Sequence, residues 1–133
     1  MTLITIREKG TNEAVISFDH RGEYVITVTD PFSTEDRRRL AWYFSEYMRF
    51  PFAKQQKKAQ EVARSIAEYG HALFSMVFQS DMGLYARYYQ ARQAGELRFE
   101  IVGSPQFHAL HWEALKDPDL PRPFALRTKI KRL

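Results

Sequence analysis

The spacing of apolar residues changes near residue 33 of this chain of 133 residues, and this change restricts the fold more than any other feature. Over residues 1–30, apolar and polar side chains alternate with a period of two, as in strands that turn one face toward a core. Turn signals at 10–12 and 19–22 separate three such runs. From residue 33 onward, apolar residues recur at helical spacing. The sequence therefore predicts a three-stranded antiparallel meander followed by a helical region.

The helical region, residues 33–94, divides into two or three helices. The first is predicted over 34–49, and the second runs from about Lys54 to Phe78. Gly70 lies in the apolar stripe of the second helix, where a missing side chain would let another backbone approach closely; the alternative is a break into two helices. A third, weaker helical pattern ends at Gly95.

Strand-like alternation returns in residues 96–133. Residues 97–102 predict a strand, 112–115 form a short segment between proline-rich stretches, and 124–130 are a candidate final strand. No linker-like stretch divides the chain, so we expect a single domain. The predicted fold class is α/β in the broad sense, and α+β within this segment.

Cysteine is absent, which excludes several classes of site within the chain. A disulfide framework, a thiolate metal site and a cysteine nucleophile all require this residue. Its absence fits a reducing compartment. No run approaches the roughly 20 apolar residues of a membrane span, and residues 1–9 lack the apolar core of a signal peptide. We therefore expect a cytoplasmic protein without a membrane-spanning segment.

His108, His111 and Glu113 are the nearest approach to a metal site. Zinc-binding helices place two histidines four residues apart with a glutamate beside the first, whereas the spacing here is three. In an extended segment the two imidazoles would point to opposite faces. The sequence thus favours one packed and one exposed histidine. Because no serine lies in a nucleophile elbow and no glycine-rich phosphate loop is present, we expect no catalytic residue, metal or cofactor.

Basic clusters are the feature that most suggests a nucleic-acid surface, with a net charge of +4 and a pI of about 9.4. The clusters and their candidate stacking partners are residues 37–39, 54–58 and 127–132, with Tyr85, Tyr88 and Tyr89. Acidic residues are interleaved nearly everywhere, so solvated helix faces and core tyrosines are the favoured interpretation. Trp42 lies off the main stripe of the first helix, which indicates either a helix buried on two sides or a contact with a partner.

Several segments share their order and spacing with one family. They are residues 40–47, 50–51, 69–74, 97–102, 107–118, 124–126 and Arg132. The most specific part is Trp112-Glu113-Ala114-Leu115 followed by Asp117-Pro118. With these segments the chain resembles the CHAT family of caspase-like bacterial proteins, which often accompany tetratricopeptide repeats. That family carries a Leu-Pro-Trp-Glu-Leu-Leu signature between two strands, and His111 replaces its proline here.

The resemblance implies that residues 96–133 begin a caspase-like sheet and that the chain is the N-terminal portion of a longer protein. It implies a structural motif made of Leu110, Trp112, Glu113, Leu115, Asp117 and Pro118. The family's peptidase uses a histidine and a cysteine downstream of this motif, and none of the four histidines here occupies that position. No catalytic residue is therefore carried over.

The function that follows is a non-catalytic scaffold and protein-interaction segment of a CHAT-type cysteine peptidase or pseudo-peptidase. The alternative is a stand-alone α/β module that binds protein or, with less support, nucleic acid. If the last strands pair with strands outside this chain, the isolated segment would expose a sheet edge, which favours a homodimer.

Overall fold

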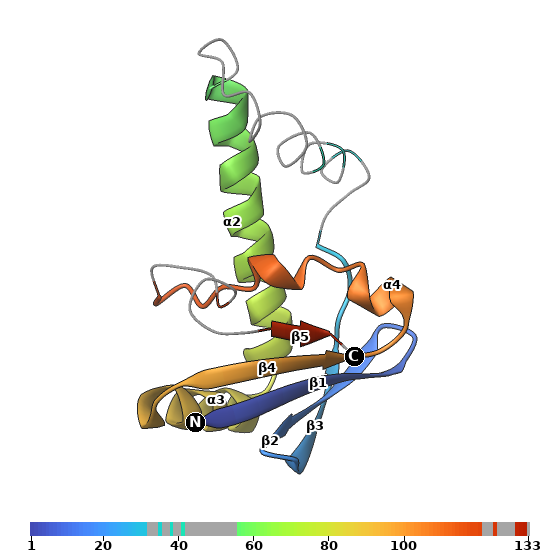
Figure 1. Cartoon of the computed structure of the whole chain (residues 1–133), viewed down its shortest axis with the longest axis vertical. Helices are drawn as coiled ribbons and strands as arrows, with labels where there is room; N and C mark the ends of the chain where they lie inside the picture. The colour runs from blue at the N-terminus through green and yellow to red at the C-terminus, as the bar shows by residue number, and fades with distance from the viewer. Residues whose placement is uncertain are drawn as a thin grey trace.

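The computed structural model of the chain describes residues 1–31, 35, 38, 41, 56–120, 124 and 130–132 (Figure 1). Its elements are β1 (Thr2–Gly10), β2 (Glu13–Phe18), β3 (Arg21–Thr27), α2 (Gln56–Phe78), α3 (Met82–Ala94), β4 (Leu97–Val102), α4 (Pro105–His108), the 3₁₀ helix η3 (Trp112–Ala114) and β5 (Ile130–Arg132). The fold is mixed α+β with an N-terminal antiparallel meander, which confirms the predicted class.

Two of the predicted elements fall largely outside the described residues. Of the helix expected over 34–49, only residues 35, 38 and 41 are described, and Trp42 is not among them. Of the strand expected over 124–130, only its two end residues are described, and Ile130 begins β5. The second and third predicted helices correspond to α2 and α3, and α2 continues through Gly70 without a break.

The five strands of the described residues belong to one sheet in the order β3-β2-β1-β4-β5. β1 pairs with β2 in antiparallel and with β4 in parallel orientation, and β4 pairs in parallel with β5. The strand predicted over 97–102 therefore extends the sheet of the meander and lies between two neighbours. The edge strands of the described sheet are β3 and β5.

The turn between β2 and β3 shows why the meander forms as predicted. Asp19 and His20 both have positive φ, of 52° and 63°, which is the requirement of a two-residue hairpin turn of type I′. Aspartate tolerates this region because its short side chain can bond locally. Here Asp19 also reaches β1, since its Oδ1 accepts a hydrogen bond of 2.9 Å from Leu3 N. The turn thus fastens the β2–β3 hairpin to the central strand.

One face of the sheet forms the core with the two long helices. Alternate residues of the strands, such as Ile4, Ile6 and Phe99, are buried in one cluster with residues of α2 and α3. Rings gather at its centre, where Phe78 and Tyr88 stack with centroids 4.5 Å apart. The C-terminal half of α2 packs in this cluster, whereas its N-terminal half extends beyond the sheet (Figure 1).

Candidate functional site

Trp112 anchors the segment that follows β4. Ser104 caps the short helix α4 by accepting a hydrogen bond from Phe107 N, and Pro105 occupies its first turn, where proline is favoured. The chain then folds back, so that the Trp112 indole packs 5.2 Å from the Phe107 ring. Trp112 is completely buried, and its Nε1 donates a hydrogen bond of 2.9 Å to Phe107 O. The polar group of the buried tryptophan is therefore satisfied within its own segment.

The backbone of η3 lies directly against α2 at Gly70. A Cβ atom built on Gly70 would lie 1.9 Å from Ala114 O, far closer than any side chain permits. Lys116 N donates a hydrogen bond of 3.3 Å to Gly70 O, and His111 N donates one of 3.0 Å to Tyr69 Oη. This close approach of two backbones confirms the reason predicted for a glycine in the apolar stripe of the helix.

Asp117 fastens the end of the same segment to α3. Its side chain is 1% exposed, and its Oδ2 accepts hydrogen bonds from Tyr88 Oη at 2.6 Å and from Arg92 Nη1 at 2.7 Å. Its Oδ1 accepts a third, of 2.9 Å, from Asp119 N. A buried carboxylate with a cationic partner and two further donors is well compensated for its lost hydration. Burial, and then the hydrogen bond to Asp117, raise the pKa of Tyr88 far above its ordinary value.

The remaining motif residues differ in exposure. Leu115 is completely buried and Leu110 is half-buried against the core. Glu113 and Pro118 are exposed, with Pro118 in a turn. The structure thus brings Leu110, Trp112 and Leu115 toward the core and leaves Glu113 at the surface.

The sequence analysis missed Tyr88 and Arg92 as partners of Asp117, because they lie 29 and 25 residues away. The only signal in the sequence was the tyrosine at a core position of a predicted helix.

His108 and His111 are both half-buried, which differs from the predicted pair of one packed and one exposed histidine. His108 is the last residue of α4, whereas the His111 ring packs edge-on against Tyr69 with centroids 5.5 Å apart. Among the described residues, no group of three or more histidine, aspartate or glutamate side chains is placed to hold a metal ion.

The three tyrosines of α3 differ in exposure and do not form a common stacking surface. Tyr88 is buried in the core, Tyr85 is half-buried, and Tyr89 is 42% exposed. The Arg92 guanidinium lies 4.6 Å from the centroid of the Tyr89 ring. The basic clusters at 37–39, 54–58 and 127–132 fall partly outside the described residues, and Arg38 is their one member whose side-chain exposure is described.

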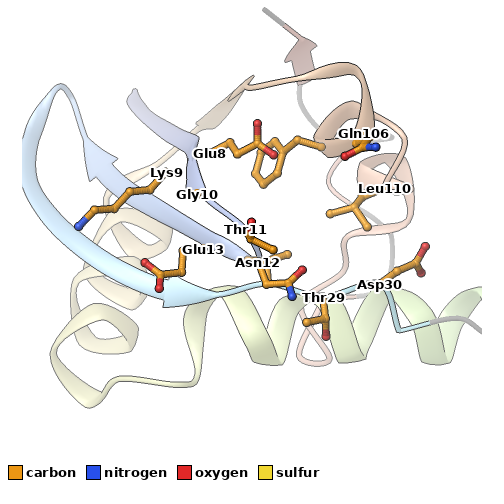
Figure 2. A pocket seen from close by; sticks show the side chains of 12 residues that line it. Glu8, Lys9, Gly10, Thr11, Asn12, Glu13, Thr29, Asp30, Gln106 and Leu110 are labelled. Carbon is orange, nitrogen blue, oxygen red and sulfur yellow. The ribbon is translucent and has the colours of Figure 1, made fainter.

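A pocket of about 540 Å³ opens where the β1–β2 turn meets α4 and the segment after β3 (Figure 2). Its lining residues are Glu8, Lys9, Gly10, Thr11, Asn12, Glu13, Val28, Thr29, Asp30, Gln106, Phe107 and Leu110. Three elements far apart in the sequence therefore build this hollow. Sequence reasoning did not identify it, because the parallel pairing of β1 with β4 is what places α4 beside the first turn.

Glu8 connects two walls of this pocket. Its Oε1 accepts a hydrogen bond of 2.9 Å from Ser104 N, and its Oε2 accepts one of 3.1 Å from Ser104 Oγ. A carboxylate at the end of β1 therefore fixes the start of α4. The volume of the pocket lies within the range of about 300–1,000 Å³ that small-molecule sites occupy.

Among the described residues, no helix is long and apolar enough to cross a membrane. Scans of the chain against protein-family models, curated proteins and solved structures each find no match.

Proposed function

We propose that the chain is a non-catalytic scaffold and protein-interaction segment of a cytoplasmic, CHAT-type caspase-like cysteine peptidase or pseudo-peptidase. The proposal starts from the order and spacing of the motif around Trp112. It is supported by what that motif does, since the segment from residue 103 to residue 120 contacts β1, α2 and α3 through its own polar groups.

The observation that carries the proposal is the set of hydrogen bonds that the buried Asp117 carboxylate accepts. In an enzyme site, a buried carboxylate beside a phenol and a guanidinium would face a cavity that admits substrate. Here both Asp117 oxygens accept hydrogen bonds from within the chain, and Asp117 does not line the pocket described above. The network therefore supports a structural role, in which a loop is held on α3.

The parallel half of the sheet is compatible with a larger caspase-like sheet. β1, β4 and β5 run in parallel, and β5 is the edge strand on that side of the described sheet. A further strand contributed by the rest of such a protein would pair there. In an isolated segment, the same edge would favour a homodimer.

The size of the native polypeptide tests this proposal. An antibody raised against residues 1–133 is used on an immunoblot of the source cells, with the recombinant 15.7 kDa chain as the size marker. We expect a product far longer than the marker, and the search for a catalytic histidine and cysteine then moves to the added sequence. A product that comigrates with the marker would overturn the assignment to a longer peptidase.

The second candidate is a stand-alone α/β module that binds protein. One observation favours it, namely that strands from both ends of the chain share a single sheet and a single buried cluster. A module of this kind unfolds in one cooperative transition as a monomer or a closed oligomer. Thermal unfolding together with light scattering after size-exclusion chromatography distinguishes it from an aggregation-prone fragment.

A further inference from the structure

The pocket between the β1–β2 turn, residues 28–30 and α4 has an apolar wall and a polar rim. Val28 and Phe107 are buried and Leu110 is half-buried, and all three line it. In Figure 2 the Leu110 side chain points toward the turn residues Thr11 and Asn12 across the hollow. A ligand that enters would therefore meet aliphatic and aromatic carbon on one side and hydroxyl and amide groups on the other.

The charge of the lining is opposite to that of the whole chain. Among the described residues, the lining contains three carboxylates, from Glu8, Glu13 and Asp30, and one cation, Lys9. Figure 2 shows the Lys9 and Glu13 side chains directed to the same side, away from Gln106 and Leu110. The chain as a whole carries a net charge of +4, so the pocket is a local reversal of sign. Such a reversal attracts cationic groups and repels phosphate and carboxylate ligands.

We propose that this pocket binds an arginine or lysine side chain from a basic segment of a partner polypeptide. Both residues carry a long aliphatic stem with a charged head, and the stem can pack along Val28, Phe107 and Leu110 while the head stays at the carboxylate rim. Arginine is favoured because its planar guanidinium donates several hydrogen bonds in a fixed geometry to carboxylate and amide oxygens. The inference rests on the proposed protein-binding function and adds the chemistry of the partner.

The shape of the site favours a polypeptide over a free amine. Its walls come from a hairpin turn, a strand end and a short helix, and the hollow is open to solvent between them (Figure 2). Neighbouring residues of a bound segment can therefore lie across the rim and add contacts that a single small cation lacks.

Fluorescence anisotropy with the full chain tests the inference. The probe is a fluorescein-labelled hexapeptide that carries one arginine on each side of a leucine. The matched probe has citrulline, which is uncharged, at both arginine positions. The rim variant combines Glu13→Gln with Asp30→Asn. The control variant combines Glu23→Gln with Glu68→Gln, which removes the same charge from two exposed carboxylates outside the lining.

We expect the arginine probe to bind the wild-type chain with at least tenfold higher affinity than the citrulline probe. The rim variant should weaken binding of the arginine probe at least tenfold, and the control variant by less than twofold. Equal affinity for the two probes, equal loss in both variants, or no binding at 1 mM of folded wild-type chain would overturn the inference. Displacement of the probe by free arginine amide as effectively as by unlabelled peptide would overturn the choice of a polypeptide.

The outcome is independent of the test of the proposed function. A long native polypeptide without arginine-dependent binding leaves the scaffold function standing and removes the pocket inference. Binding by a chain whose native size is 15.7 kDa removes the link to a longer peptidase and leaves the pocket as the binding site of a stand-alone module.

Discussion

Replacing Gly70 with alanine should destabilise the protein although the change normally favours a helix. Alanine in place of glycine within a helix contributes about 1 kcal/mol of stability through its higher propensity. At Gly70, however, the added Cβ would lie 1.9 Å from Ala114 O, whereas ordinary contact begins at 3.4 Å. The backbone of η3 would have to withdraw from α2 by most of the difference, because a carbonyl oxygen cannot turn aside as a flexible side chain can.

Three contributions set the change in unfolding free energy that Gly70→Ala should cause. Overpacking of a well-fitted site costs about 1–3 kcal/mol. Separation of the two backbones also weakens the hydrogen bond from Lys116 N to Gly70 O, at a cost of about 1 kcal/mol. After the gain in helix propensity, we expect Gly70→Ala to lower the free energy of unfolding by about 2 kcal/mol, which corresponds to a fall in Tm of about 8 °C.

Circular dichroism at 222 nm, followed during thermal and urea unfolding, measures this effect. Ser75→Ala is the matched control, because Ser75 is an exposed residue of the same helix, and we expect it to change stability by less than about 0.5 kcal/mol. A Tm for Gly70→Ala that equals or exceeds that of the wild type would refute the close approach of η3 to α2.

Three further predictions concern residues that lie in the segment that follows β4 or that form hydrogen bonds with it. Trp112→Ala should lower the free energy of unfolding by about 3–5 kcal/mol, measured by urea denaturation, because it empties a completely buried site; an unchanged Tm would contradict its structural role. The raised pKa of Tyr88 means that the free energy of unfolding falls as pH rises above about 10. In this range Tyr88 ionises in the unfolded chain, whereas its phenol beside Asp117 stays protonated in the folded chain. Unfolding free energies across this range should fall less steeply for Tyr88→Phe than for the wild type, and equal slopes would contradict the shift. Glu8→Ala should cost about 1 kcal/mol in urea denaturation, because two donors of Ser104 lose their acceptor, whereas no change would show that solvent replaces the contact.

The local structure was predictable where the sequence carries a local signal. Alternation and turn residues place the meander, and Asp19-His20 indeed forms the tight turn that follows β2. The helical stripes place α2 and α3, including the close contact at Gly70. Sheet order was not predicted, because the pairing of β1 with β4 joins residues that are more than 90 apart and leaves no periodic trace in either strand.

The candidate sites depend more than the helices and strands do on contacts between residues far apart in the sequence. Trp112 was singled out from its motif, yet the sequence could not name its hydrogen-bond acceptor, Phe107 O, because this depends on how α4 and η3 fold back. The partners of Asp117 and the pocket have the same origin, since both require two distant segments to meet. Residue type alone indicated that Asp117 would need donors if buried, but not which donors.

The position of β1 bears on how both candidate functions can work. β1 is the central strand, with the β2–β3 hairpin on one side and β4 on the other, and its last residues carry Glu8 to the start of α4. The β1–β2 turn is therefore connected through one strand to the sheet face that forms the core, and through Glu8 to the start of α4. An occupant of the pocket would contact this turn and α4 together, and it would stabilise the folded chain by binding only the state in which the two are adjacent. Binding of a basic segment should consequently raise the Tm of the whole chain in a single transition, and a shift confined to part of the unfolding curve would show that the sheet does not unfold as one unit.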